Sequence, residues 1–203
     1  MKAFTQVRAR AVPLMRPNID TDQIIRIERL IDHPRGSLGP WCLESLRYLP
    51  DGQPNPQFPP NQTRYQSAQI LVAGDNFGCG SSREHAVWSL VDWGMRAVIA
   101  PSFGDIFYNN CFQNGLLPVR LSETDVTAIA QELQQATDPV LTVDLHACTV
   151  STPRGQVLSF SIEPERRDAL LAGLDDIGMT LRAQSAIEAF RTADAQARPW
   201  IYI

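Results

Sequence analysis

Short apolar runs alternate with longer amphipathic segments through the middle of the chain. An apolar run bounded by glycine or proline predicts a buried strand, and apolar positions that recur every three or four residues predict a helix. The predicted strands are residues 4–14, 69–74, 96–100 and 116–121. The predicted helices are residues 82–93, 103–114 and 122–136. Strands that alternate with helices in this way are typical of a parallel sheet with crossover helices, and we therefore expect an α/β fold.

Individual residues predict where these helices begin and end. Gly94 and Gly115 follow predicted helices, at positions where a left-handed residue commonly closes a helix. Ser122 precedes the next helix, and its hydroxyl is suited to accept a hydrogen bond from a backbone N–H of the first turn. Asp125 places a favourable negative charge in that turn.

The pattern changes in the last third of the chain. Residues 141–151 and 156–162 flank a Pro-Arg-Gly turn and predict antiparallel strands, which would form an additional antiparallel sheet. Helical segments follow them. The chain ends in the apolar string RPWIYI at residues 198–203, which we expect either to form a last strand or to contact a partner.

Residues 33–64 carry neither pattern. Proline recurs along this segment, where it removes backbone donors and disfavours helix. We expect an irregular Pro-rich excursion with one short helix near residues 41–48. A loop of this length is usually functional, and the alternative is a mobile surface loop without a role.

Composition narrows the possible functions. The chain has 203 residues, 44% of them apolar, which suits one domain with a substantial core. Its 18 basic and 22 acidic residues give a net charge of −4, which argues against a nucleic-acid partner. No apolar run is long enough for a membrane span, and the polar N-terminus does not resemble a signal peptide. We therefore expect a cytoplasmic protein without a membrane partner.

The four cysteines do not form a recognisable metal motif. They are widely spaced, without a C-x-x-C pair, and in a chain of this length they are expected to be reduced thiols. Their positions are Cys42, Cys79, Cys111 and Cys148.

The segment richest in chemistry is GCGSSREH at residues 78–85, between a predicted buried strand and a predicted helix. Ligands of open α/β sheets bind at this edge. Two glycines let the backbone approach a ligand, the free N–H groups of a first helical turn attract an anion, and Arg83 offers a planar charged fork for a carboxylate. The segment predicts an anion site that would also stabilise negative charge on a serine hydroxyl.

Simpler interpretations of the same residues stay open. Ser81 and Glu84 match the capping box, in which Ser81 would only begin a helix. Cys79 has no identifiable partner base and is interpreted as an incidental thiol, and His85 as a packing residue. The patterns of a P-loop, a nucleophile elbow and a dinucleotide-binding loop are incomplete here.

Two further carboxylates follow an earlier turn. Asp20 and Asp22 lie two residues apart, where they would act either as turn and cap residues or as part of a site. Two aspartates alone would hold a metal ion weakly.

Several segments of the chain resemble the aconitase superfamily and, within it, the family of 3-isopropylmalate dehydratase (isopropylmalate isomerase) small subunits. The segments are, in chain order, NIDTDQII, PDGQPNPQF, GDNFGCGSSREHA, RAVIAPSFGDIFYNNCFQNGLLPV and LDDIGMTL. The resemblance covers most of the chain. It implies that residues 1–203 form a swivelling β/β/α layered domain with a central parallel sheet and a helical C-terminal tail.

The resemblance also implies a reaction. Members of this family belong to a two-subunit hydro-lyase of leucine biosynthesis that isomerises 2-isopropylmalate to 3-isopropylmalate through isopropylmaleate. A [4Fe-4S] cluster, bound by cysteines of a separate large subunit, acts as the Lewis acid for the leaving hydroxyl. By this resemblance the chain itself binds no metal or cofactor, takes a small dicarboxylate substrate and requires the large subunit as its partner.

The family's functional residues map onto the turn. Ser81 would act, as an alkoxide, as the base that removes a proton from carbon. Arg83 would bind a substrate carboxylate and help to stabilise that alkoxide. Ser82 and Gly80 would belong to the same substrate-binding turn, and Asp22 matches an aspartate near the active site.

One segment departs from the family pattern and keeps other functions open. Residues 26–30 read RIERL, where relatives commonly carry proline and then aliphatic or aromatic residues near the substrate's alkyl group. A related malate-type dehydratase, acting on citramalate, dimethylmalate or a homoaconitate-like acid, is the first alternative. A non-catalytic dicarboxylate-binding module and a serine hydrolase are the others, and Arg35 is a further candidate for a carboxylate contact.

Overall fold

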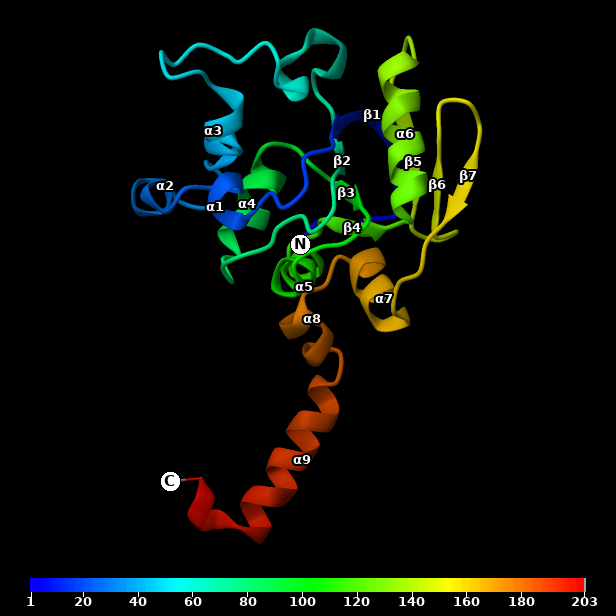
Figure 1. The fold of residues 1–203 in the computed structure, drawn as a ribbon. Helices are drawn as coiled ribbons and strands as arrows, with labels where there is room; N and C mark the ends of the chain where they lie inside the picture. Colours follow the sequence, from blue (N-terminus) through cyan, green and yellow to red (C-terminus); the bar gives the residue numbers. More distant parts are fainter. Residues whose placement is uncertain (203) are drawn as a thin grey trace.

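The computed structural model describes residues 1–202, and its strands form one seven-stranded mixed sheet (Figure 1). The strand order along the sheet is β4-β3-β2-β1-β5-β6-β7. The strands are β1 (Gln6–Leu14), β2 (Ile70–Ala73), β3 (Ala97–Ala100), β4 (Leu117–Arg120), β5 (Val140–Asp144), β6 (Thr149–Ser151) and β7 (Val157–Ser159). The three strands predicted for the parallel sheet are confirmed as β2, β3 and β4, and the strand predicted over residues 4–14 is confirmed as β1. The α/β fold is confirmed with them.

The first strand joins the parallel and antiparallel parts of the sheet. Residues 6–10 pair antiparallel with β5, and residues 11–14 pair parallel with β2. Strands β2, β3 and β4 continue the parallel part, and β6 and β7 continue the antiparallel part. The additional antiparallel sheet is therefore present, but it shares β1 with the parallel sheet.

The antiparallel part has one more turn than the sequence pattern indicates. The alternation over residues 141–151 predicts one strand, whereas the chain turns at residues 145–148 between β5 and β6. The Asp144 side chain accepts a hydrogen bond from the N–H of Ala147 (2.9 Å), and Cys148 adopts a left-handed φ of 53°. The prediction of a single strand was wrong because Leu145, inside the turn, is buried and so continues the apolar alternation.

Helices cover both faces of the parallel strands. Helix α6 (Glu123–Gln135) contacts β1, β2 and β3, while α4 (His85–Asp92) and α5 (Asp105–Gln113) contact each other on the other side of these strands in Figure 1. The residues of β2 and β3 are all buried, as expected for strands covered on both faces.

The predicted end signals of these helices are confirmed. The Ser122 hydroxyl accepts a hydrogen bond from the N–H of Asp125 (3.1 Å) and begins α6. After α4, Gly94 adopts a φ of 104°, and the N–H of Met95 reaches back to the carbonyl of Leu90 (2.9 Å). This pair of features is the Schellman motif, which satisfies the free carbonyls of the last turn.

The segment 33–64 consists of irregular chain and short helices, as its proline content predicts. The segment contains η1 (Gly39–Trp41), α3 (Glu44–Arg47) and η2 (Pro59–Asn61), and η3 (Thr63–Tyr65) begins at its end. It follows α1 (Thr21–Ile24) and α2 (Ile27–Asp32). Leu38, Cys42, Leu43 and Phe58 are buried. The segment is therefore packed against the rest of the molecule through its own apolar side chains.

The C-terminal residues form helices instead of a last strand. The helices are α7 (Pro164–Ala172), α8 (Asp176–Leu181), α9 (Gln184–Ala197) and η4 (Pro199–Ile201), and α9 extends away from the sheet (Figure 1). The alternative of a last strand is wrong for residues 198–202, because η4 folds them back against α9; Ile203 lies outside the described residues. Among residues 1–202, no helix has the length and apolar composition to cross a membrane.

The turn after β2 packs tightly against α5. Gly78 has a φ of 72°, and a Cβ placed on it would lie 2.3 Å from Cγ of Phe107. On the other side of this contact, a Cβ on Gly104 would lie 2.5 Å from the carbonyl oxygen of Gly78. Both positions therefore require glycine for the turn to reach its place beside the helix.

We expect Gly78→Ala to lower the free energy of unfolding by about 2–4 kcal/mol, because it adds both backbone strain and a clash with Phe107. Urea denaturation of the two proteins measures this difference. The matched control is Gly36→Ala, at φ 93° with no atom within 4 Å of the added Cβ, which should cost only the strain of about 1–2 kcal/mol. Equal losses in the two variants would show that the packing against Phe107 is not limiting.

Candidate functional site

The turn at residues 78–83 lies at the carboxyl end of β2 and presents its polar residues to solvent. Gly80, Ser81 and Ser82 are exposed, whereas Gly78 is buried. An exposed serine in a fixed turn after a parallel strand is available to a ligand or to a partner surface.

Backbone hydrogen bonds attach this turn to the start of α1. The N–H of Gly78 donates to the carbonyl of Ile19 (2.7 Å), and the N–H of Thr21 donates to the carbonyl of Cys79 (2.9 Å). The N–H of Ser81 donates to the Thr21 hydroxyl oxygen (3.1 Å). The segments 19–22 and 78–81 are therefore held side by side as one unit.

Gly80 lets the turn bend next to α1. Its φ is 92°, a conformation that residues with a side chain rarely adopt. A Cβ at this position would come within 3.5 Å of the Asp20 Cβ and 3.6 Å of the Thr21 hydroxyl oxygen, which is ordinary contact. The requirement for glycine at position 80 is thus one of backbone conformation and not of space.

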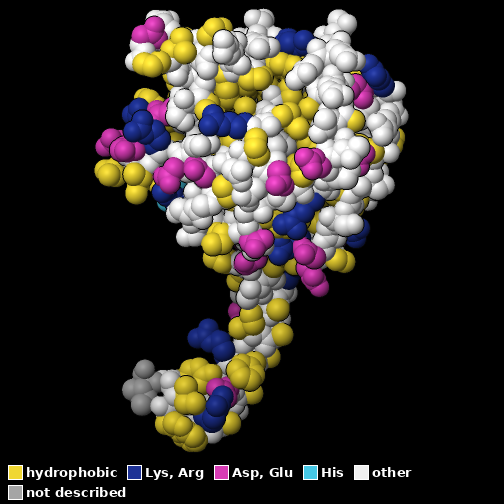
Figure 2. Space-filling model, in the orientation of Figure 1, with side chains coloured by type: hydrophobic (Ala, Val, Ile, Leu, Met, Phe, Trp, Pro, Cys, Tyr) yellow, Lys and Arg dark blue, Asp and Glu magenta, His cyan; other side chains and the backbone are white. Residues whose placement is uncertain are grey.

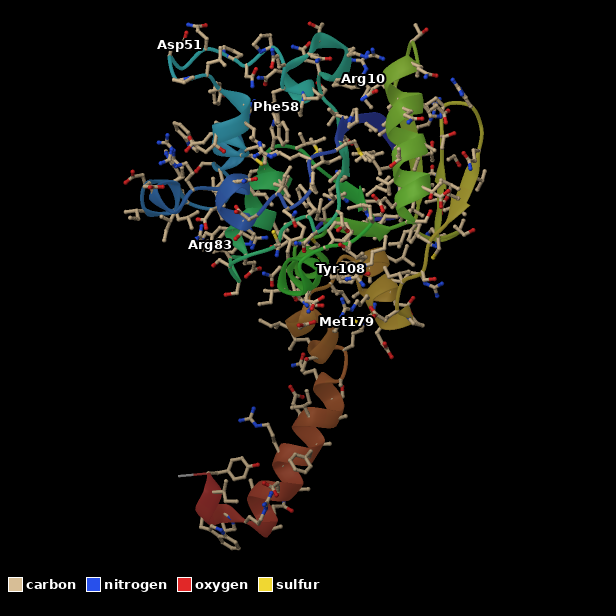
Figure 3. All side chains as sticks on the ribbon, in the orientation of Figure 1. Arg10, Asp51, Phe58, Arg83, Tyr108 and Met179 are labelled. Atoms are coloured by element: carbon tan, nitrogen blue, oxygen red, sulfur yellow. The ribbon has the colours of Figure 1, made fainter. Side chains whose placement is uncertain are left out.

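Arg83 and Asp22 form an ion pair across the two segments. The Arg83 Nη1 lies 2.5 Å from Oδ1 of Asp22, and it also reaches the carbonyl of Ile25 (3.5 Å). The Arg83 side chain is 19% exposed and that of Asp22 61% exposed. The guanidinium, labelled in Figure 3, is therefore held in one place, and the aspartate that pairs with it remains open to solvent.

Two predictions about the helix after the turn were wrong. Helix α4 begins at His85 with Glu84 as its N-cap, so Ser81 lies outside the helix and receives no support from the N–H groups of its first turn. The capping box is absent too, because the N–H of Ser81 is donated to Thr21, and Glu84 instead accepts a hydrogen bond from Asn114 (2.7 Å). The hydrogen bond from Ser81 to Thr21 and the positive φ of Gly80 keep residues 81–83 out of the helix.

The two aspartates before the turn serve separate purposes. The Asp20 side chain accepts a hydrogen bond from the N–H of Gln23 (2.7 Å) and caps α1, as the cap interpretation predicts. Asp22 faces Arg83 instead. Among residues 1–202, no three side chains of His, Cys, Asp or Glu come together as a possible metal site.

Sequence reasoning missed two residues that build this region. Thr21 is buried and supplies the oxygen that fixes Ser81. Asn114 is buried at the end of α5; it donates to Glu84 and accepts a hydrogen bond from Nη2 of Arg35 (2.7 Å). Only Thr21 carried a usable signal, since it lies within the TDQI string, whereas Asn114 is brought to the turn by the packing of α5.

Cysteine and histidine chemistry is disfavoured around the turn. Burial and the nearby charge of Asp20 raise the pKa of the Cys79 thiol above its ordinary value, which lowers the thiolate fraction at neutral pH. Burial raises the pKa of Cys42 to about 12. His85 lies against the Trp88 ring, with ring centroids 4.4 Å apart. The incidental thiol and the packing histidine are the interpretations that fit these surroundings.

The unusual charges of residues 26–30 are paired within the chain. Glu44 receives Arg29 at 2.9 Å and Arg26 at 3.6 Å, and the Arg29 guanidinium stacks over Trp41 at 3.8 Å from the ring centroid. A cavity of about 300 Å³ beside them is lined in part by Asp20, Asp22, Arg26 and Ile27. Since Glu28 also pairs with Arg26 at 3.5 Å, two carboxylates balance the two arginines, and the segment does not supply two free cations to a ligand.

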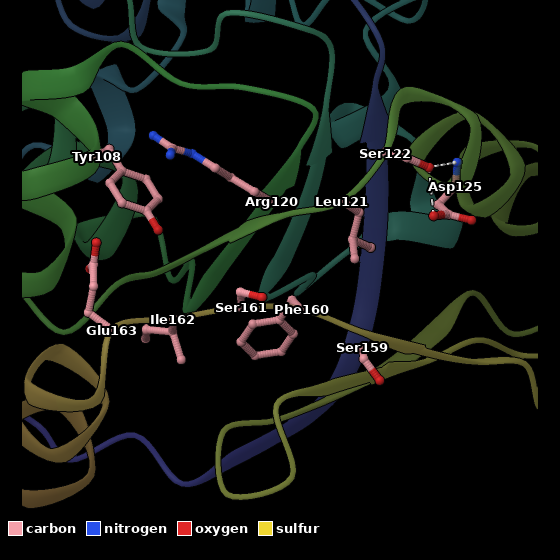
Figure 4. Close-up of a pocket in the computed structure, with 10 residues that line it drawn as sticks. All are labelled: Tyr108, Arg120, Leu121, Ser122, Asp125, Ser159, Phe160, Ser161, Ile162 and Glu163. Atoms are coloured by element: carbon pink, nitrogen blue, oxygen red, sulfur yellow. Dashed lines mark hydrogen bonds between the residues drawn. The ribbon is translucent and has the colours of Figure 1, made fainter.

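A separate cavity of about 580 Å³ lies between the end of β4 and the start of α7 (Figure 4). Its charged groups are occupied internally: Arg120 stacks on Tyr108 at 3.8 Å, Ser122 donates to Asp125 at 2.6 Å, and Glu163 pairs with Arg166 at 2.7 Å. None of the predicted site residues lines this cavity. The turn at residues 78–83 remains the candidate site.

Comparison with known proteins relates this geometry to a family. Residues 1–124 match the model of the aconitase C-terminal domain. The chain is 48% identical to the 3-isopropylmalate dehydratase small subunit of Roseobacter denitrificans over 99% of this chain and 100% of that protein. It is also 48% identical to the small subunit of Agrobacterium fabrum over 98% of this chain and 100% of that protein.

A solved structure shares the fold. The crystal structure of 3-isopropylmalate dehydratase (leuD) from Methanocaldococcus jannaschii matches 92% of this chain and 99% of its own chain, with a TM-score of 0.64 and 26% sequence identity. The layered arrangement expected from the family resemblance is thus the arrangement of a known relative. Full-length identity, the domain match and the shared fold together establish that this chain belongs to the family of 3-isopropylmalate dehydratase small subunits, within the aconitase superfamily.

Proposed function

We propose that this chain, together with a large subunit, interconverts 2-isopropylmalate and 3-isopropylmalate through isopropylmaleate, and that the turn at residues 78–83 is its part of the active site. The observation that carries the proposal is an exposed Ser81 in a turn fixed by Thr21, with the restrained guanidinium of Arg83 two residues away. The full-length identity to small subunits of this dehydratase supports the substrate.

The binding role falls to Arg83 and the backbone around it. The substrate is a dicarboxylate, and a planar guanidinium can bind a carboxylate with two parallel hydrogen bonds. Asp22 pairs with Nη1 of Arg83, whose side chain is 19% exposed, and a substrate carboxylate would bind the part of the guanidinium that Asp22 leaves free. Gly80 and Ser82 complete the turn, since both are exposed and neither places a bulky side chain in the way of the ligand.

The base role falls to Ser81. Its alkoxide accepts the proton from C3 of 2-isopropylmalate, the electrons of that C–H bond form the C2–C3 double bond, and the hydroxyl leaves C2 as hydroxide, which takes up a proton from solvent and is released as water. In the second half, a water molecule gives its hydroxide to C3 and its remaining proton to solvent, while Ser81 gives the proton it holds to C2. The product is 3-isopropylmalate, and Ser81 is an alkoxide again. The permanent positive charge of Arg83 favours the alkoxide, because a preorganised cation stabilises developing negative charge.

The iron–sulfur cluster of this reaction is assigned to the large subunit. The side chains of residues 1–202 do not fit such a group, since they bring together no set of three metal ligands and the four cysteines stand apart as free thiols. When bound in the large subunit, a [4Fe-4S] cluster would act as a Lewis acid on the leaving hydroxyl.

The direct test is turnover by the assembled enzyme. The chain is mixed anaerobically with the large subunit, and isopropylmaleate is followed by its ultraviolet absorbance. A panel of 2-isopropylmalate, citramalate, dimethylmalate and homoaconitate compares the acids that differ in their side chain. We expect 2-isopropylmalate to have the highest kcat/KM, and a higher value for another acid would replace it as the substrate.

Ser81→Ala should lower kcat by about 10²–10⁴-fold, because it removes the base while leaving the carboxylate site in place. The KM should change little. Steady-state kinetics of the assembled enzyme measures both constants. Cys79→Ser, two residues earlier in the same turn, is the control and should keep wild-type turnover. Normal turnover by Ser81→Ala would exclude this serine as the base.

Asp22→Asn should raise KM by about two- to fivefold with most of kcat retained, because an ion pair with an exposed partner contributes little free energy and Arg83 would lose only its restraint. The control is Glu28→Gln, which removes a carboxylate paired with Arg26 at 3.5 Å and not with Arg83. A fall in kcat as large as that of Ser81→Ala would mean that Asp22 contacts the reacting atoms.

A further inference from the structure

The last helices of the chain, residues 176–202, form an arm that has little contact with the rest of the molecule. Every residue from 181 to 193 is exposed, and neither α8 nor α9 contains a buried residue. The arm leaves the body after α8 and extends outward (Figure 1). Its base is attached to α5, where the N–H of Asp176 donates to the Gln113 side chain (3.2 Å).

Large apolar side chains are presented along this arm. Ile177 and Leu181 lie four residues apart in α8 and are 72% and 56% exposed. Phe190 in α9 is 64% exposed and Trp200 in η4 is 67% exposed. Figure 2 shows hydrophobic side chains, in yellow, along the arm and near its end. Several large apolar side chains exposed on one arm are typical of an interaction surface.

The end of the arm is held in a defined shape. The Asp194 carboxylate accepts hydrogen bonds from Nε of Arg198 (2.6 Å) and from the hydroxyl of Tyr202 (2.8 Å). These bonds fold η4 back against α9, and they leave Trp200 on the outside. A preformed end loses less conformational freedom when it binds, which favours affinity.

The arm lacks the tertiary packing that stabilises most protein helices. A single helix of 14 residues such as α9 is marginal in water, because most of the stability of protein helices comes from packing of an apolar face. Phe190 and Ile187 lie three residues apart and so share a face of the helix, and both are exposed. Covering this face would supply the missing packing.

We infer that the arm docks on the large subunit, in an apolar groove bordered by carboxylates; this inference rests on the two-subunit function proposed above. The aconitase C-terminal domain match ends at residue 124, whereas the matches to small subunits continue over 98–99% of the chain and so include the arm. The arm therefore lies in the part of the chain that the small subunits share outside the aconitase C-terminal domain. Among residues 1–202, no carboxylate pairs with Arg182 or Arg191, which leaves them for acidic groups at the groove's edge.

The test compares Phe190→Glu with Ser185→Glu in the full-length chain. Ser185 lies on the other side of α9, so the control adds the same charge to the same helix. Titration of the labelled chain with the large subunit measures Kd. We expect Phe190→Glu to weaken binding by about 30-fold or more, since a buried aromatic at an interface is a common hot spot. The control should change Kd less than about threefold, and kcat at saturating large subunit should be unchanged in both.

The outcomes separate this inference from the proposed function. If Phe190→Glu binds the large subunit as tightly as the wild type does, while the wild-type complex turns over isopropylmalate, the arm is not the docking element and the function stands. If sedimentation of the isolated chain shows a dimer that only Phe190→Glu dissociates, and binding of the large subunit is unaffected, the arm is a contact between two copies and the inference is overturned. If the wild-type chain binds the large subunit without any turnover, the proposed function fails and the docking inference is judged by Kd alone.

Discussion

The candidate site depends on the hydrogen bonds that attach the turn at residues 78–81 to the segment 19–22. These segments are about sixty residues apart in the chain, and three backbone N–H groups join them. The buried hydroxyl of Thr21 is the decisive group, because it takes the N–H of Ser81 that would otherwise be free to begin a helix. Without this attachment, Ser81 would have no fixed orientation and Arg83 would have no partner at Asp22.

The same attachment changes the physical basis expected for serine activation. A serine at a helix N-terminus would gain from the partial positive charge of the helix dipole. Here α4 begins four residues after Ser81, and the N–H groups of Ala86 and Val87 donate to the carbonyls of Arg83 and Glu84. In the proposed mechanism, the charge that stabilises the Ser81 alkoxide therefore comes from Arg83, which would also bind a substrate carboxylate. Because Asp22 pairs with that guanidinium, the affinity of this site for a substrate carboxylate would depend on how the partner and the substrate change the ion pair.

The proposed complex would use two distinct surfaces of this chain. The turn at residues 78–83 is open to solvent at the edge of the sheet, and the C-terminal arm extends elsewhere in the molecule (Figure 3, labels Arg83 and Met179). A partner that completes the site at the turn and also covers the arm would hold this chain at two points. Such two-point contact would fix the orientation of the turn relative to groups supplied by the partner, and orientation is a large part of catalysis.

The sequence by itself determined the strands and helices of residues 69–136, because short apolar runs and helical periodicity report burial directly. It also located the turn, because Gly80 at a positive φ and the serines beside it are local features. Tertiary structure decided which groups the turn contacts: Thr21, Asp22 and Asn114 reach it through hydrogen bonds, an ion pair and the packing of α5, over separations that no local pattern encodes. It likewise decided that α4 starts at His85, because the hydrogen bond to the distant Thr21 overrides local helix propensity. The C-terminal string folds back on α9 because Asp194 accepts hydrogen bonds from Arg198 and Tyr202.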